Sequence, residues 1–100
     1  MKKITLKTVI KEQIHKDPKF AEHYQREVLI NEISKMIVEL RNRAHLTQAE
    51  LAEKAGTTQP VIARLESGID TRIPSLNLLT RIARASHARL HIGFDILKHS

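Results

Sequence analysis

The segment QPVIARLES, residues 59–67, brings together side chains that can recognise the edges of DNA bases. A glutamine can pair bidentately with adenine and an arginine with guanine, and Gln59 and Arg64 are of these types. Pro60 and Ala63 offer small apolar surfaces that can contact a thymine methyl group. If this segment is a helix, these four side chains share its outward face. The pattern then predicts a reader of the major groove.

Phosphate contacts are expected just before this segment and one helix earlier. Gln48 and Thr57 lie where the amides and side chains at helix N-termini hold phosphates. Thr58, next to Thr57, is a further candidate of the same kind. Phosphate contacts of this type fix the position of a protein on the duplex, whereas base contacts carry the sequence preference.

Two short helices joined by a tight turn must position these side chains, over Thr47–Gly68. Thr47 and Glu50 have the spacing of a capping box, in which each side chain bonds the other residue's backbone amide. Gly56 ends the first helix where a positive φ is expected. Thr58 caps the second helix, and the proline that follows lies in its first turn.

The two helices have residues suited to a close crossing. Ala52 lies where the two backbones meet, and a larger side chain would separate them. The apolar residues that point inward are Leu51, Ile62 and Leu65. These features predict a helix-turn-helix, and the alternative is an ordinary helical hairpin with a solvated polar face.

Helices are also predicted on both sides of this motif. Thr5 caps a first helix that runs to about His15, and Asp17-Pro18 starts another that continues to about Ala44, with a break near Arg26. Its later part carries an apolar stripe at helical spacing. The stripe consists of Leu29, Ile33, Met36, Ile37, Leu40 and Ala44. After the motif, Ser75 caps a helix over residues 76–85.

The periodicity changes to two near the C-terminus, which predicts a β-strand over residues 88–96. The apolar positions of this strand are Ala88, Leu90, Ile92, Phe94 and Ile96. No second strand is predicted, and a lone strand leaves backbone groups unpaired along both edges. We therefore expect it to pair with the same strand of a second subunit, or with a different protein. Leu90, Ile92, Phe94 and Ile96 are the candidate dimer residues.

Composition limits the classes of function. One hundred residues, 41% of them hydrophobic, suit one small domain, and a net charge of +6 suits a polyanionic partner. The absence of cysteine excludes disulfides and thiolate metal sites and is compatible with a cytoplasmic location. No apolar run approaches the roughly 20 residues that span a membrane. The N-terminal MKKITLK lacks the apolar region of a secretory signal.

Catalysis and metal binding are not expected. His87 and His91 would share a face of the predicted strand, but would lie roughly 13 Å apart, too far to bind one ion. No catalytic triad, glycine-rich phosphate loop or pair of carboxylates in a cleft is evident. We expect no enzyme activity, no cofactor and no metal.

The central sequence LTQAELAEKAGTTQPVIARLESG resembles the Xre/Cro-like helix-turn-helix of phage repressors, and the likeness covers residues 37–86. The resemblance implies a domain of four or five helices. With the flanking helix and strand predicted above, the expected fold is mainly α, a lambda-repressor-like helix-turn-helix bundle with an N-terminal helical extension and one C-terminal β-strand that pairs across a dimer. The resemblance also implies that the chain binds double-stranded operator DNA as a homodimer.

The same resemblance assigns individual residues. Gln48 and Gln59 match positions for phosphate and base contacts, and Arg64 matches a later base-contacting position. Arg72 lies in the segment that runs along the DNA backbone or minor groove in relatives. An arginine before the motif and a glutamate that ends the recognition helix form a buried structural pair in such repressors. Arg41 and Glu66 are the matching residues.

The flanks resemble those of HigA-type antitoxins, through TLKTVIKEQIHKDPKFAEHYQREVL before the motif and ARLHIGF after it. This resemblance implies that the chain neutralises a RelE/HigB-like toxin, a ribonuclease that cuts mRNA on the ribosome, and represses its own operon. One departure is Ser86-His87, where relatives often have Leu-Gly. The expected division is 1–26 as a toxin-binding extension, 27–86 as the DNA-binding domain and 87–100 as the dimerisation strand.

The charge of the N-terminal part leaves the toxin-binding surface open. RelE-like toxins are usually basic, yet residues 1–40 have a net charge of +2. An acidic face can still form from Glu12, Asp17, Glu22, Glu27, Glu32 and Glu39, or these residues simply form a solvated surface. Two alternatives to an antitoxin are a free-standing transcription regulator, and an interaction protein whose helix-turn-helix does not bind DNA.

Overall fold

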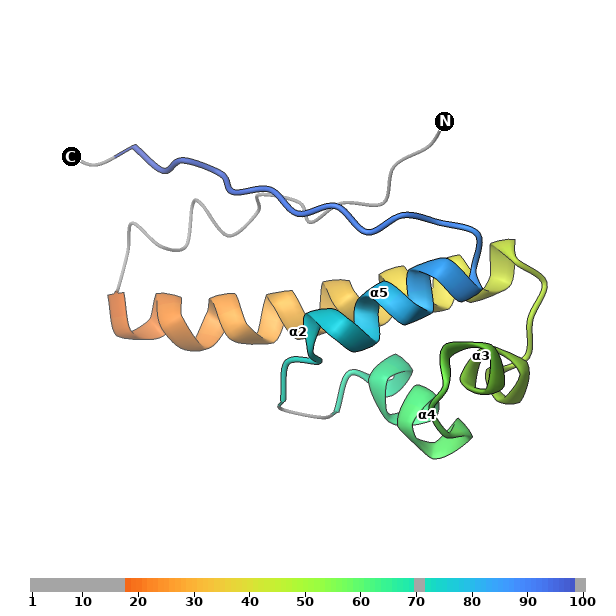
Figure 1. The fold of residues 1–100 in the computed structure, drawn as a ribbon. Coiled ribbons are helices and arrows are strands. Elements are labelled where there is room, and N and C mark those ends of the chain that lie inside the picture. The colour runs from red at the N-terminus through yellow and green to blue at the C-terminus, as the bar shows by residue number, and fades with distance from the viewer. Residues whose placement is uncertain (1–17, 70–71, 99–100) are drawn as a thin grey trace.

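The computed structural model describes residues 18–69 and 72–98, and this part of the chain contains four helices and no β-strand. The helices are α2 (Pro18–Arg43), α3 (Gln48–Ala55), α4 (Gln59–Ser67) and α5 (Leu76–Ala85), shown in Figure 1. The mainly helical fold class is therefore confirmed. The helix predicted over Thr5–His15 lies outside the described residues.

Helix α2 is continuous over 26 residues, so the predicted break near Arg26 is wrong. The segment after Pro18 contains neither glycine nor proline, and nothing in it interrupts the helical hydrogen bonds. The C-terminal half of α2 packs on the other helices, with Ile33 and Ile37 in the core. Its N-terminal half extends beyond the other three helices (Figure 1).

The core forms where α3 packs on α4 and α5, while α2 packs on α4. Leu51 and Ile62 have no exposed surface, and Ile82 of α5 is 1% exposed. Burying each such side chain contributes about 1.5–3 kcal/mol. Ala52 is also buried, at 3% exposure, as expected where two helix backbones approach closely. The inward positions predicted for the helix-turn-helix are thus those that build the core.

Helix ends in this structure share a closing geometry, with a left-handed residue after the last turn. At the end of α3 this residue is Gly56, with a φ of 69°. At the ends of α2 and α5 it is a histidine, His45 and His87, each with a φ of 57°. At the end of α5, the Ala88 amide donates to the Ala83 carbonyl at 2.8 Å, as in a Schellman motif. His87 thus adopts the backbone conformation for which glycine is usually needed.

The C-terminal segment 88–98 follows α5 without forming a strand, which differs from the strand predicted over residues 88–96. A strand is defined by ladder hydrogen bonds, and the described chain provides no second strand to accept them. The apolar positions beyond Leu90 are exposed: Ile92 by 59%, Phe94 by 94% and Ile96 by 91%. Pairing across a dimer stays a prediction.

Candidate nucleic-acid interface

Helix α3 begins with the predicted capping box. The Glu50 amide donates to Thr47 Oγ1 at 3.1 Å, and the Thr47 amide donates to Glu50 Oε1 at 2.8 Å. Hydrogen bonding to Thr47 lowers the pKa of Glu50. The bond from the Thr47 amide has the largest effect, and the bond with the Thr47 side chain adds to it. This cap fixes the first turn of α3, where Gln48 is the first residue.

Helix α4 presents the predicted base-contacting residues. Gln59, Pro60 and Arg64 are exposed, and Ala63 is half buried. Thr58 is the N-cap residue, but its side chain makes no capping hydrogen bond, unlike Thr47 in α3. Pro60 instead lies in the first turn, where its fixed φ favours a helix start and its missing amide hydrogen costs little.

The buried pair Arg41–Glu66 joins the end of α2 to the end of α4. Arg41 Nε donates to Glu66 Oε2 at 2.7 Å and Arg41 Nη2 to Glu66 Oε1 at 3.0 Å. Their side chains are 18% and 6% exposed. Hydrogen bonding to Glu66 raises the pKa of Arg41. Arg41 Nη1 also donates to the Leu46 carbonyl at 3.0 Å, which attaches the α2–α3 connection to the same pair.

Two glutamines extend this pair to the outer surface. Gln48 Nε2 donates to Glu66 Oε1 at 3.0 Å, and Gln59 Nε2 donates to Gln48 Oε1 at 2.8 Å. A chain of hydrogen bonds therefore runs from Arg41 through Glu66 and Gln48 to Gln59. Because Gln48 uses its amide nitrogen on Glu66, its oxygen is directed at Gln59. The structure brings together the residues predicted for phosphate contact, base contact and structural pairing.

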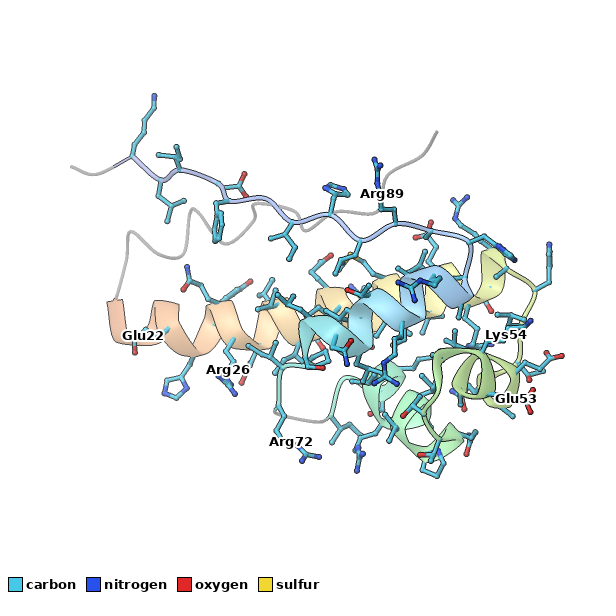
Figure 2. The ribbon with its side chains drawn as sticks, in the orientation of Figure 1. Glu22, Arg26, Glu53, Lys54, Arg72 and Arg89 are labelled. Atoms are coloured by element: carbon cyan, nitrogen blue, oxygen red, sulfur yellow. The ribbon has the colours of Figure 1, made fainter. Side chains whose placement is uncertain are left out.

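Three other predicted contact residues lie in the connections before and after α4. Thr57 is half buried and Thr58 is exposed, both in the turn between α3 and α4. Arg72 is exposed on the connection between α4 and α5, on the same side of the molecule as α4 in Figure 2. Arg89, on the C-terminal segment, lies on the opposite side in that view. The excess positive charge is thus spread over more than one face.

Two residues that hold the helices of the helix-turn-helix in place were not identified from the sequence. Ser34 of α2 is buried, and its hydroxyl donates to the Glu66 carbonyl at 2.7 Å. Arg81 Nη1 donates to the carbonyls of Ala55 and Gly56, both at 2.9 Å, and so closes the end of α3. Each contact joins residues that are 25 to 32 positions apart, which no local pattern indicates.

Alternative site chemistries find no support in the described ranges. Within residues 18–69 and 72–98, no group of three or more His, Cys, Asp or Glu side chains is placed to bind a metal ion. Among the same residues, no helix is long and apolar enough to cross a membrane.

Comparisons with known proteins agree with this geometry. Residues 37–85 match the helix-turn-helix family. Antitoxin HigA1 of Mycobacterium tuberculosis, from strains CDC 1551/Oshkosh and ATCC 25618/H37Rv, is 30% identical over 87 residues. The matched region is 87% of this chain and 57% of the relative, so the chain spans little more than half the length of these relatives. No solved structure gives a significant match. Residues 37–85 therefore form a helix-turn-helix domain, and the predicted resemblance to HigA-type antitoxins with an Xre-like helix-turn-helix is confirmed.

Proposed function

We propose that this chain is an antitoxin that binds a RelE/HigB-like mRNA-cleaving toxin and represses its own operon by binding operator DNA. The hydrogen-bonded chain from Arg41 to Gln59 carries the DNA-binding half of the proposal. It holds a base-reading side chain at the start of α4 before any DNA is present. The similarity to HigA1 antitoxins supports the toxin-binding half. Operator binding and toxin neutralisation would both take place in the cytoplasm, where the operon and the ribosomes lie.

In the proposed complex, α4 enters the major groove. Gln59 and Arg64 read adenine and guanine edges, while Pro60 and Ala63 contact thymine methyl groups. Their exposure and their position on one short helix are consistent with this role.

Phosphate contacts flank the groove in the same complex. Gln48, Thr57 and Thr58 hold the backbone beside the start of α4, where the helix dipole favours negative charge. Arg72 extends this contact along the connection to α5. These residues position α4 and carry no sequence preference themselves.

Two copies of the chain are needed for a complete operator. One copy reads one half-site, and paired half-sites lie about 34 Å apart along the duplex. We propose that the segment carrying Leu90, Ile92, Phe94 and Ile96 joins the two copies. The high exposure of Ile92, Phe94 and Ile96 supports this assignment, because an isolated copy leaves them in water.

The toxin-binding surface is proposed to include residues 1–26. The N-terminal half of α2 projects beyond the helix-turn-helix (Figure 1) and carries Glu22 (Figure 2), and both Glu22 and Glu27 are exposed. These two carboxylates can pair with cations of a basic ribonuclease, while Lys19 and Arg26 in the same part of the sequence balance their charge. The projection is remote from α4 in chain order, which allows one chain to perform both tasks.

Co-expression with a RelE-like ribonuclease tests the toxin-binding half. We expect the full chain to restore growth and to co-purify with the ribonuclease, whereas a variant lacking residues 1–26 does neither and still shifts operator DNA. A double variant, Gln59→Ala with Arg64→Ala, is the matched control, because it should rescue growth and lose the DNA shift. If the full chain neither restores growth nor co-purifies with the ribonuclease, yet still shifts operator DNA, the free-standing regulator is the correct function.

A further inference from the structure

The C-terminal segment 88–98 carries an apolar face with no partner in the described chain. Leu90 is half buried, and exposure then rises to 59% at Ile92 and 94% at Phe94. We infer that this segment pairs with a second copy of itself as an antiparallel strand, in which Ile92 lies opposite Ile92 of the partner subunit and the apolar side chains of the two copies contact one another. This inference rests on the dimer in the proposed function and specifies its register.

Symmetry restricts how two identical strands can pair. A closed dimer has a two-fold axis, and its interface is self-complementary. An axis perpendicular to the two-stranded ribbon makes the strands antiparallel and keeps both apolar stripes on one face. An axis along the strands makes them parallel and places the stripes on opposite faces, so that no continuous apolar surface forms. The perpendicular axis is therefore the favoured one.

The alternation of side chains then requires one residue to lie opposite the same residue of the partner subunit. Residues directly opposite in an antiparallel pair point to the same face, and faces alternate with a period of two. The sequence numbers of two opposite residues must therefore differ by an even number. The residue midway between them then lies on the two-fold axis, opposite its own copy in the partner subunit. The candidates near the centre of the segment are His91, Ile92 and Gly93.

The charged residues of the segment select among these candidates. Arg89 and Asp95 lie on the face opposite the apolar stripe, and Ile92 is midway between them. With Ile92 on the axis, each Arg89 lies opposite Asp95 of the partner subunit, which gives two stabilising cross-strand pairs by symmetry. Moving the axis by one residue in either direction removes both pairs.

The same register matches the apolar side chains by size. Leu90 lies opposite Phe94 of the partner subunit, and Ala88, the smallest apolar residue of the stripe, lies opposite the partner's Ile96. An aliphatic side chain opposite an aromatic one is a favourable pair across antiparallel strands. The neighbouring registers also pair apolar residues with one another, so the charged residues select the register and the apolar pairs are compatible with it.

Disulfide cross-linking measures this register directly, because the chain contains no cysteine. In the Ile92→Cys variant, the two cysteines lie opposite each other, at a separation that a disulfide spans. We expect mild oxidation of a dilute sample to convert most of this variant to a covalent dimer on a non-reducing gel. Gly93→Cys is the matched control and should remain mostly monomeric on the gel. Efficient cross-linking of the control with little at position 92 would overturn the register.

A charge exchange gives a second, independent readout. Arg89→Asp or Asp95→Arg alone should weaken the dimer about tenfold in sedimentation, since each places like charges opposite each other twice. The combined exchange should restore the dimer, and a combined variant as weak as the single ones contradicts the register. Operator binding by the wild-type chain, measured alongside, separates the outcomes. If the wild-type chain is a dimer that binds operator while Gly93→Cys is the variant that cross-links, the proposed function stands and the register is wrong. A monomeric wild type overturns the inference itself.

Discussion

At the residue scale, Glu66 is the centre of the site because it accepts from both Arg41 and Gln48. Its side chain is 6% exposed, so its charge is stabilised by these donors more than by water. The ends of two helices and the start of a third thus meet at one carboxylate. We expect substitutions of Glu66 to affect both the stability of the fold and the orientation of α4, because these contacts join the two.

Removing Arg41 is expected to destabilise the fold strongly. Arg41→Ala leaves Glu66 buried without its cation, and the free energy of unfolding should fall by about 3 kcal/mol in a denaturant titration. Arg43→Ala is the control, because Arg43 and Glu39 form an exposed pair on the same helix, 51% and 38% exposed. That variant should change stability by about 0.5 kcal/mol or less. Equal losses for the two variants would contradict a structural role for Arg41.

Gln48 and Gln59 are expected to act together on DNA. Gln59→Ala should cost about 1–3 kcal/mol of operator affinity, and most of that loss should concentrate at one base pair. Gln48→Ala should lower affinity and also reduce discrimination at the same base pair, because its oxygen holds Gln59. A double-mutant cycle in a gel-shift titration measures the coupling. Strictly additive losses would show that the hydrogen bond between the glutamines has no part in recognition.

At the element scale, the contacts at the ends of the helices fix where α3 begins and ends and how α4 follows it. Thr47 starts α3 with a reciprocal cap, Gly56 ends it in a left-handed turn, and Arg81 satisfies its last carbonyls. The cap and the glycine were predicted from their spacing, since both act within a few residues. The arginine was not, because it reaches α3 from another helix.

The Glu50 cap makes stability depend on pH. The folded-state pKa of Glu50 is lowered, so its contribution is present above the ordinary glutamate pKa of about 4.3 and is lost as pH falls through the lower folded-state value. Glu50→Gln should therefore lower Tm at neutral pH and show a smaller further loss on acidification. Glu53→Gln, on the same helix, should follow the wild-type curve. Parallel curves for wild type and Glu50→Gln would contradict the cap's role.

The left-handed histidine after α5 is expected to be suboptimal for stability. A β-carbon in this conformation costs about 1–2 kcal/mol, while glycine loses about 0.5–1 kcal/mol more backbone entropy on folding. His87→Gly should therefore raise the free energy of unfolding slightly, by up to about 1 kcal/mol. His87→Ala removes the imidazole and keeps the β-carbon, so it should not stabilise. Calorimetry of the two variants distinguishes backbone relief from a role of the ring.

At the scale of the whole molecule, the helix-turn-helix occupies one end of α2, and the rest of α2 and the C-terminal segment extend away from it (Figure 1). With a net charge of +6, and Arg72 and Arg89 on opposite sides in Figure 2, DNA contacts use only part of the positive charge. This arrangement allows the proposed tasks of DNA binding, toxin binding and dimer pairing to use separate surfaces.

Operator binding by the whole dimer should depend steeply on salt. Each phosphate neutralised releases counterions, so a log–log plot of affinity against salt should fall with a slope of about −0.9 per neutralised phosphate. Arg72→Ala should make the slope shallower by about 1 for each phosphate that Arg72 neutralises in the wild type, with little change in sequence preference. An affinity that does not change between low and moderate salt would contradict DNA binding.

The sequence by itself determined the helix-turn-helix, because caps, a turn glycine and apolar spacing act locally along the chain. It also indicated Gln59 and Arg64 as base readers and, through family resemblance, Arg41 with Glu66. Only the tertiary structure showed that α2 is unbroken, that Gln48 joins Glu66 to Gln59, and that Arg81 closes α3. These features depend on side chains from distant elements meeting in space. The C-terminal segment shows the same division, since its alternation is local whereas strand formation needs a partner strand that residues 18–69 and 72–98 do not supply.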